Sequence, residues 1–255
     1  MSRSVAVIGS SGKTGRAVCT ALEEVGIDVR ALTRADSNLE TGEGLANALS
    51  GCSVVYHLAP NLHPLEVVIA KNVLRAAKVA GTEKLIFHSV LQPQISVMPH
   101  HFAKSQVEEL VINSGLKWAI LQPATYVQNL TALLVGALPY RASAPFSFVD
   151  LRDVGRAAVR LIVDEQTCFG TFEAAGPITN VGDVSDALGW PCAESSIADW
   201  KSRNSTLPSY QFECLAAMFS YYDEHGLIGS SLTLTELIGR QPIHAVDALR
   251  RELRL

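Results

Sequence analysis

The sequence predicts an α/β protein built on a doubly wound parallel sheet, and four successive features at its start predict this fold. Residues 5–8 are four apolar residues in a row, which is typical of a buried parallel strand. Glycines in the spacing Gly-x-x-Gly-x-x-Gly follow at once, and a helical pattern of apolar residues then runs to Gly26. A second strand is expected over 27–33. Strand, glycine turn, helix and strand in this order indicate a Rossmann-type unit that binds a nucleotide.

The three glycines of the turn have separate tasks. Gly9 allows a sharp turn, Gly12 removes a side chain where the backbone approaches a phosphate, and Gly15 allows close packing of helix on strand. The following helix points its free N–H groups and its positive dipole end at this place, which favours a diphosphate. The sequence Gly-Lys-Thr within the turn imitates the end of a P-loop. That motif needs a glycine where Val7 stands, so we exclude ATP or GTP hydrolysis.

Strand and helix patterns continue to alternate, but the third strand is short or missing. Residues 34–45 hold one large apolar residue, Leu39, before the next helix, whereas a parallel strand needs a run of β-branched or large apolar side chains. In the strand order 3-2-1-4-5-6 of this fold, that loss makes the second strand the edge of the sheet. Further strands are expected at 52–58, 83–90, 117–123, 146–150 and 170–175, and helices at 45–49, 65–80, 100–114 and 152–163.

The second half of the chain is patterned more loosely. We expect residues 1–140 to form the nucleotide-binding core, 146–176 to return to it, and 177–255 to form a small C-terminal substrate lobe. Aromatic residues gather in this tail, where they form either a core or the wall of a substrate cleft, because ligand pockets are lined mainly by apolar and aromatic side chains. They are Trp200, Tyr210, Phe212, Phe219, Tyr221 and Tyr222.

Composition and charge narrow the class of protein. The 255-residue chain has a net charge of −4 and no basic stripe, which argues against a nucleic-acid partner. No apolar run approaches the ~20 residues of a membrane span, and the first strand begins within a few residues of Met1, so we expect a cytoplasmic protein without a signal peptide. The five cysteines are scattered, which predicts reduced thiols and no metal site. We expect a monomer or homodimer that acts on a small molecule.

The end of the second strand bears on the cofactor. In dinucleotide folds a carboxylate here holds the ribose 2′-hydroxyl of NAD, while an arginine accommodates the 2′-phosphate of NADP. Arg34 therefore favours NADP, although Asp36 lies close enough to favour NAD, and a solvated turn arginine is the alternative. The expected cofactor contacts from the glycine turn and the strand ends are Gly9, Ser11, Gly12, Lys13, Thr14, Gly15, Arg34, Leu58, Ala59, Pro60, Ser89 and Pro123.

Several segments together resemble the NmrA-like family of atypical short-chain dehydrogenases/reductases. The resemblance implies an NAD(P)-binding α/β fold with a small C-terminal substrate lobe. The family includes quinone, azo-dye and phenylpropanoid reductases, and also redox-sensing proteins that bind NADP without established catalysis. The matching segments span most of the chain and are 7–15, 100–104 with 107–110, 121–129, 150–155 and 237–242.

The segment His-His-Phe-Ala-Lys departs from the pattern of the related reductases. Those with a Tyr-x-x-x-Lys pair use the tyrosine as proton donor, and here His100 takes the tyrosine position before Lys104. The resemblance implies that Lys104 contacts the nicotinamide ribose. His101 or His100 would supply the proton, because an unperturbed imidazole titrates near 6.5. Adjacent helix residues point ~100° apart, so only one of the two should face the cleft. Surface or packing positions are the alternatives. Expected substrate contacts are His88, Tyr126, Asn129 and Phe148.

These observations combine into one functional hypothesis and two alternatives. The first is an NADP-preferring reductase, with NAD as the alternative cofactor, that acts on a small apolar, aromatic or quinone-like substrate. The second is an NADP(H)-sensing regulatory protein without turnover. The third is an isomerase or cyclase that binds the cofactor without consuming it.

Overall fold

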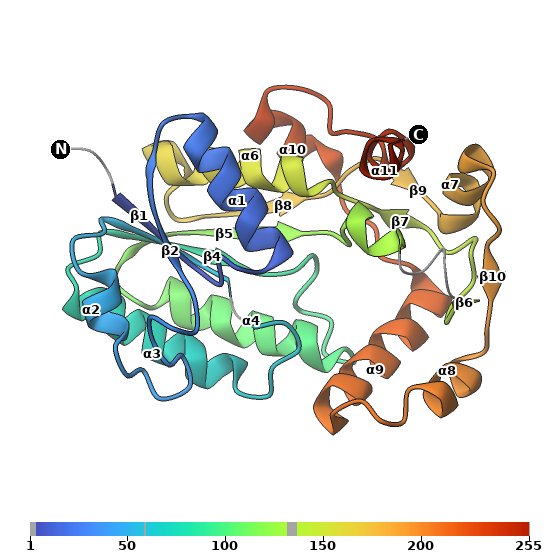
Figure 1. Cartoon of the computed structure of the whole chain (residues 1–255), viewed down its shortest axis with the longest axis horizontal. Coiled ribbons are helices and arrows are strands. Elements are labelled where there is room, and N and C mark those ends of the chain that lie inside the picture. Colours follow the sequence, from blue (N-terminus) through green and yellow to red (C-terminus); the bar gives the residue numbers. More distant parts are fainter. Residues whose placement is uncertain (1–3, 59, 132–136, 255) are drawn as a thin grey trace.

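The structure is a computed structural model that describes residues 4–58, 60–131 and 137–254. Its centre is a six-stranded sheet in the order β2-β1-β3-β4-β5-β8 (Figure 1). Every neighbouring pair in this sheet is parallel, which confirms the predicted fold class. The strands are β1 (Ser4–Ile8), β2 (Asp28–Leu32), β3 (Val54–His57), β4 (Lys84–His88), β5 (Lys117–Pro123) and β8 (Gly170–Ala174).

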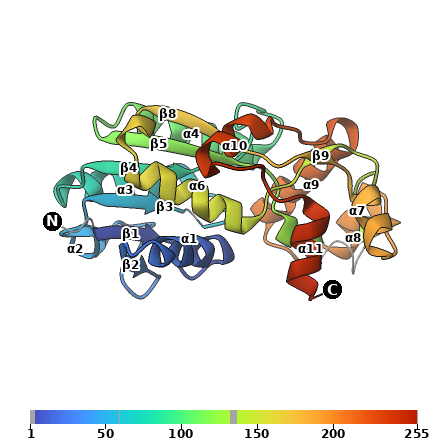
Figure 2. The same cartoon turned by 90° about the horizontal axis from the view of Figure 1, so that it is seen from above.

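Helices cover both faces of the sheet, as Figures 1 and 2 show. Successive strand residues point to opposite faces, so Val5 and Val7 join the core beneath one helical layer and Ala6 and Ile8 the core beneath the other. Both faces are buried, which explains why β1 is apolar without alternation. One layer holds α1 (Lys13–Glu24), α6 (Leu151–Val163) and α10 (Ser231–Ile238); the other holds α2 (Leu45–Leu49), α3 (Glu66–Val79) and α4 (Pro99–Ile112).

The predicted loss of the third strand is confirmed for this part of the chain. Residues 33–44, all described, contain turns and no strand, and β2 is the edge of the sheet. Arg30 on this edge donates hydrogen bonds to the carbonyl oxygens of Ala48 and Ser50 at 3.0 and 2.6 Å. These carbonyls lie at the C-terminus of α2, where a cation is favourable. The end of α2 thus flanks the edge of the sheet where the third strand would lie in the complete fold.

Most of the remaining elements lie beyond the carboxyl end of the sheet (Figure 1), whereas the short turn around Glu165 lies at its amino end, where Glu165 pairs with Lys117 at the start of β5. The strand expected over 146–150 is confined to Phe146–Ser147, and Val149 forms only an isolated bridge to Tyr126. Helix α10 belongs to the predicted C-terminal lobe, yet it packs on α6 and β8 of the nucleotide-binding core. The division of the chain into a core and a lobe at residue 177 stays a prediction. These elements are η1 (Val127–Asn129), β6 (Ala137–Leu138), β7 (Phe146–Ser147), η2 (Glu165–Thr167), β9 (Ile178–Thr179), α7 (Val181–Leu188), β10 (Ala193–Glu194), α8 (Ile197–Arg203), α9 (Ser209–His225) and α11 (Ala245–Leu253).

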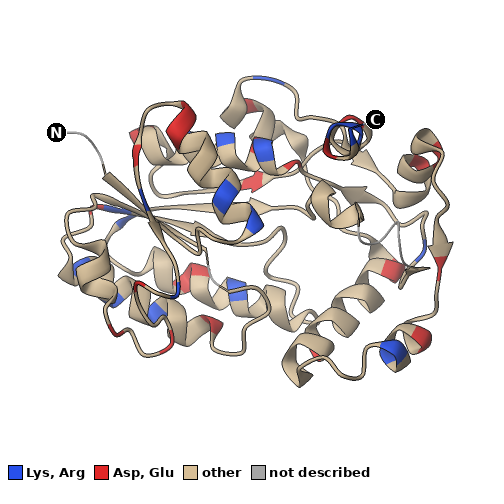
Figure 3. Cartoon of the chain, viewed as in Figure 1, with Lys and Arg blue, Asp and Glu red and all other residues tan. Residues whose placement is uncertain are grey.

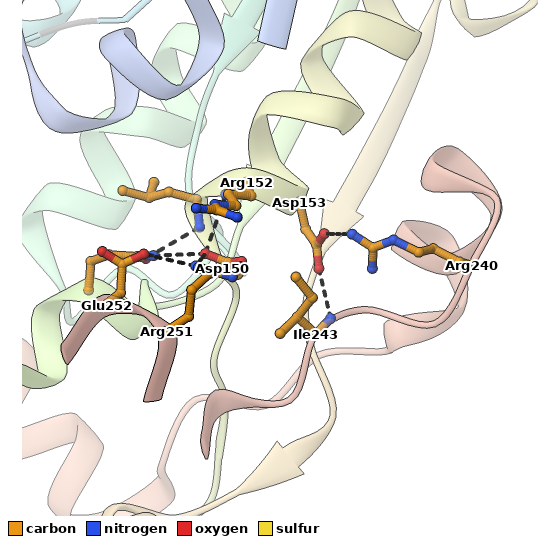
Figure 4. A network of polar contacts seen from close by, with 9 residues as sticks. Asp150, Arg152, Asp153, Arg240, Ile243, Arg251 and Glu252 are labelled. Carbon is orange, nitrogen blue, oxygen red and sulfur yellow. Dashed lines mark hydrogen bonds and ion pairs between the residues drawn. The ribbon is translucent and has the colours of Figure 1, made fainter. Parts of the chain in front are cut away.

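Two fully buried carboxylates at the start of α6 fasten the C-terminal segment (Figure 4). Asp150 accepts two hydrogen bonds from Arg251, both at 2.9 Å, and Asp153 pairs with Arg240 and accepts from Ile243 N–H at 2.8 Å. Burial opposes ionisation of Asp150, but the hydrogen bonds from Arg251 and Gln128 hold its pKa below the ordinary value. Because Gln128 lies on η1, this network also fixes the segment that follows β5.

Charge is spread over the whole molecule. Figure 3 shows acidic and basic residues interspersed over the helices on both faces of the sheet. None of the helices in the described parts of the chain is long and apolar enough to cross a membrane.

Candidate functional site

A cavity of about 690 Å³ opens at the carboxyl ends of the strands. Strand β1 leads into α1 on one face of the sheet, whereas β3 leads through a loop into α3 on the other face. Connections that leave in opposite directions create a crevice between the two strand ends, and this switch point is where open α/β sheets bind ligands. The cavity starts at the glycine turn after β1 and extends to Leu215 and Met218 on α9.

The geometry of the glycine turn agrees with the roles predicted for its glycines. Gly9 has a φ of +76°, and a Cβ there would lie 2.7 Å from the Leu58 carbonyl oxygen. A Cβ at Gly15 would overlap the backbone of Gly9 and Ser10. At Gly12 it would meet only Gly9 O, at 3.4 Å, so the space beside Gly12 is open toward the cavity. Helix α1 begins here without a side-chain cap or an acidic residue in its first turn, which leaves its amide groups for an anion.

Arg34 and Asp36 are placed differently. Arg34 lines the cavity beside Thr33, while Asp36 does not line it. The Asp36 carboxylate accepts hydrogen bonds from the backbone N–H and the hydroxyl of Thr33, at 2.7 and 2.9 Å. These two bonds, the backbone one first, lower the pKa of Asp36. One carboxylate oxygen, Asp36 Oδ2, is thus engaged in its own turn, and of these two side chains only that of Arg34 lines the cavity.

Lys104 is buried in the cavity wall next to a carboxylate that the sequence analysis did not single out. Lys104 Nζ lies 2.8 Å from Glu66 Oε1 and donates a hydrogen bond to His88 O at 3.2 Å. Both side chains are buried, and the ammonium lies 5.0 Å from the centre of the Phe87 ring. Glu66 stands three residues before Ile69 and seven before Val73, on the apolar face of α3. A carboxylate on an apolar helix face was the feature of the sequence that could have identified Glu66 as a site residue.

His100 and His101 both line the cavity, so the prediction that only one of them faces it is wrong. The cavity continues around the first turn of α4 toward α9, which explains this result. Burial is the main cause that lowers the pKa of His101 to about 4, and it lowers that of His100 well below its ordinary value, with the Lys104 charge adding to both shifts. Burial therefore moves the pKa of both rings below that of a free imidazole.

A chain of three aromatic side chains links the sheet to the cavity. Tyr56 Oη lies 2.7 Å from His88 Nδ1, and His88 Nε2 lies 2.7 Å from Tyr126 Oη. Burial is the first cause that lowers the pKa of His88 to about 3 and raises that of Tyr126 to about 12. Tyr126 lines the cavity, whereas Tyr56 is fully buried behind it. Both tyrosines and the imidazole are thus uncharged near neutral pH.

The cavity gathers most of the predicted site. Lys13, the first residue of α1, donates a hydrogen bond to Asn129 Oδ1 on η1. Ala59 lies outside the described residues. Phe148 does not line the cavity, so its position corrects the predicted substrate contact: it stacks on Phe146, two residues away on the same face, with ring centres 5.1 Å apart. The predicted residues that line the cavity are Gly9, Ser11, Gly12, Lys13, Thr14, Gly15, Arg34, Leu58, Pro60, His88, Ser89, His100, His101, Lys104, Pro123, Tyr126 and Asn129.

Two aromatic residues of the C-terminal segment, Phe219 and Tyr222, also line the cavity. This agrees with the predicted alternative in which the aromatic residues of this segment form the wall of a cleft. Among the described residues, no group of three or more His, Cys, Asp or Glu side chains is placed to hold a metal ion. The site is therefore a crevice with the glycine turn at one end and apolar and aromatic side chains from α9 at the other.

Residues 35–240 match the NmrA-like family, and this match covers most of the chain. The chain belongs to the NmrA-like family. Two curated relatives are each 26% identical to it. The NAD(P)H azoreductase of Xenophilus azovorans matches over 212 residues, 72% of this chain and 70% of that protein. The photosystem II assembly factor Ycf39 of Cyanophora paradoxa matches over 203 residues, 68% of this chain and 63% of that protein.

Among solved structures, this NmrA-like chain is similar to the NADPH-dependent quinone oxidoreductase QOR2 of Escherichia coli in complex with NADPH. The TM-score is 0.83 at 20% identity, and the match covers 98% of this chain and 99% of that one. At this identity the likeness establishes the fold.

Proposed function

We propose that this protein is an NADP-preferring reductase that transfers a hydride to a small, apolar acceptor of the aromatic or quinone type. The observation that carries the proposal is that one continuous cavity joins the glycine turn to the apolar wall formed by Leu215, Met218 and Phe219. A dinucleotide bound on the turn would place its nicotinamide toward that wall. The bound cofactor supplies the hydride, and the protein supplies position and a proton.

The preference for NADP is supported by the end of β2. Arg34 lines the cavity, and the Asp36 carboxylate is held by Thr33. A 2′-phosphate would meet a guanidinium there, whereas the carboxylate of Asp36, which could hold the 2′-hydroxyl of NAD, does not line the cavity. Two of the similar proteins support the proposal that this chain is a reductase. The azoreductase relative uses NAD(P)H, and the quinone oxidoreductase of the same fold is NADPH-dependent.

The first test is cofactor binding. Titration of the protein with NADPH and NADH should show tighter binding of NADPH, and Arg34→Ala should weaken NADPH binding by roughly thirtyfold, about 2 kcal/mol, while NADH changes little. Arg30→Ala is the matched control, because Arg30 lies on β2, four residues before Arg34, and contacts the end of α2 instead of the cavity. Equal affinity of the native protein for both cofactors would contradict the NADP preference.

The second test is turnover. NADPH oxidation followed against a panel of quinones, enones and azo compounds should identify at least one acceptor. An NADP(H)-sensing protein is the second candidate, because His100 replaces the tyrosine of the reductase pattern and Glu66 compensates the charge of Lys104. Tight NADPH binding without turnover on any acceptor would favour the sensor.

A further inference from the structure

Tyr56, His88 and Tyr126 form a hydrogen-bonded chain whose direction can be worked out. His88 is the only hydrogen-bond partner that the described residues offer to the Tyr56 hydroxyl, through Nδ1 at 2.7 Å. If Nδ1 carried the imidazole proton, it would donate to Tyr56, and the Tyr56 hydroxyl proton would be buried without an acceptor. An unsatisfied buried donor costs about 1–3 kcal/mol. Tyr56 is 0% exposed, so this cost applies in full.

The opposite tautomer satisfies every group. Tyr56 then donates to Nδ1, the proton sits on Nε2, and Nε2–H donates to the Tyr126 oxygen 2.7 Å away. Tyr126 keeps its own hydroxyl proton for the side that faces the cavity, where Thr14 of the glycine turn lies. The second ring nitrogen of a histidine sets its tautomer in this way in many active sites.

We propose that Tyr126 is the proton donor of this reductase, and that His88 and Tyr56 are positioning residues that aim its hydroxyl proton into the cavity. This proposal rests on the proposed function. It assigns the acid to a side chain outside the His-His-Phe-Ala-Lys segment, and thereby fills the role that no tyrosine before Lys104 can take.

The reaction balances as follows. A hydride from the reduced nicotinamide adds to one atom of a C=C, C=O or N=N bond of the acceptor, and the π electrons move to the conjugated or neighbouring atom. That atom takes the proton from Tyr126 Oη, the dinucleotide is left oxidised, and the phenolate accepts the hydrogen bond from His88 Nε2–H. Solvent that enters the cavity returns the proton to Tyr126. Because an enolate or a reduced azo nitrogen is a strong base, a phenol of raised pKa still protonates it.

Acceptors differ in how much they need this proton. Hydride addition to a quinone leaves a stable hydroquinone anion, which is a weak base, whereas an enone or azo acceptor develops a strongly basic centre. Loss of a true proton donor should therefore depend on the acceptor. Loss of a side chain that only shapes the cavity should affect both acceptors alike, and this difference separates the two roles.

The experiment compares Tyr126→Phe with Tyr221→Phe, a control outside the cavity. Tyr126→Phe should keep NADPH affinity within about twofold, lose about 10²–10⁴-fold in kcat on an enone or azo acceptor, and lose less than about tenfold on a quinone. Nitrogen NMR of labelled histidine, without cofactor or acceptor, should show His88 protonated on Nε2, and Tyr56→Phe should shift it toward the Nδ1–H form.

Three other results would each refute the proposal. His88 protonated on Nδ1 in the native protein refutes the direction of the chain and with it the proposal. Equal losses on both kinds of acceptor in Tyr126→Phe refute the proton donor while the reductase stands. Failure of the native protein to bind NADPH or to turn over any acceptor overturns the proposed function and the donor together.

Discussion

Glu66→Gln probes the buried ion pair in the cavity wall. Glu66 Oε1 lies 2.8 Å from Lys104 Nζ, and the two side chains are 2% and 6% exposed. The substitution keeps the size of the side chain and removes its charge, so Lys104 becomes a buried cation without its carboxylate. We expect the variant to fold but with a lower free energy of unfolding.

The structure sets the size of this loss. At a separation of 2.8 Å and an effective dielectric constant of about 20, two unit charges attract by roughly 6 kcal/mol. Desolvation offsets part of this attraction, and removal of one partner of a buried pair typically costs about 3–5 kcal/mol. Lys104 keeps its hydrogen bond to His88 O and its contact with the Phe87 ring, which places the loss near ~3 kcal/mol. For a chain of this size that corresponds to a fall in Tm of roughly 6–12 °C.

Urea unfolding at neutral pH measures the loss, and a double-mutant cycle with Lys104→Met isolates the pair. The double variant should recover much of the stability, because neither charge is left alone. Glu165→Gln is the matched control: Glu165 lies 2.9 Å from Lys117 Nζ, but these side chains are 45% and 50% exposed, so the loss should stay below about 1 kcal/mol. A Glu66→Gln variant no less stable than this control would refute the reasoning.

Two further predictions concern the turn and the buried histidines. Gly12→Val should abolish NADPH binding without unfolding the protein, because Gly12 has a φ of −70° that valine adopts and its Cβ would meet only Gly9 O, at 3.4 Å. Isothermal titration checks this, with exposed Thr20→Val as control. Burial holds the pKa values of His57 and His88 at about 3, whereas an unfolded histidine titrates near about 6.5. Between these values the folded state binds fewer protons than the unfolded state. The free energy of unfolding should therefore be highest above about pH 6.5 and fall as the pH drops toward about 4. Urea unfolding between about pH 7.5 and about pH 5 measures this, and a flat profile would contradict it.

The fold could be predicted because its signals are local. The apolar run of β1, the glycine spacing and the polar stretch after Arg34 each lie within one short window, and together they specify the strand, the turn and the missing neighbour. The cavity-lining residues of the strand ends follow from the same logic, since the carboxyl ends of parallel strands meet at one edge. Phe148 was misplaced because the alternation of its predicted strand shows that it shares a face with Phe146 but not whether that face points to the core or to the cavity.

The chemistry of the site could not be predicted, because it depends on contacts between distant segments. Tyr56 and His88 meet because the parallel register pairs Tyr56 with Ile86, which puts the residue two further along β4 on the same face. Glu66 meets Lys104 because α3 and α4 pack side by side. Burial of the histidines of α4 involves α9, more than a hundred residues later in the chain, so a model-peptide pKa was the only value that the sequence could offer.

The distribution of charge along the cavity supports the choice of an apolar acceptor. The end at the glycine turn holds two cations, Lys13 and Arg34, and the free amide groups of α1, which together suit the phosphates of a dinucleotide. At the other end Lys104 is compensated by Glu66, and the rings of His88 and His101 are neutral near pH 7. An anionic acceptor would therefore meet no uncompensated cation among the described residues there and would lose its hydration on entry. A neutral aromatic molecule loses little hydration and gains contact with the apolar side chains of α9, and it can still accept a proton from a neutral hydroxyl.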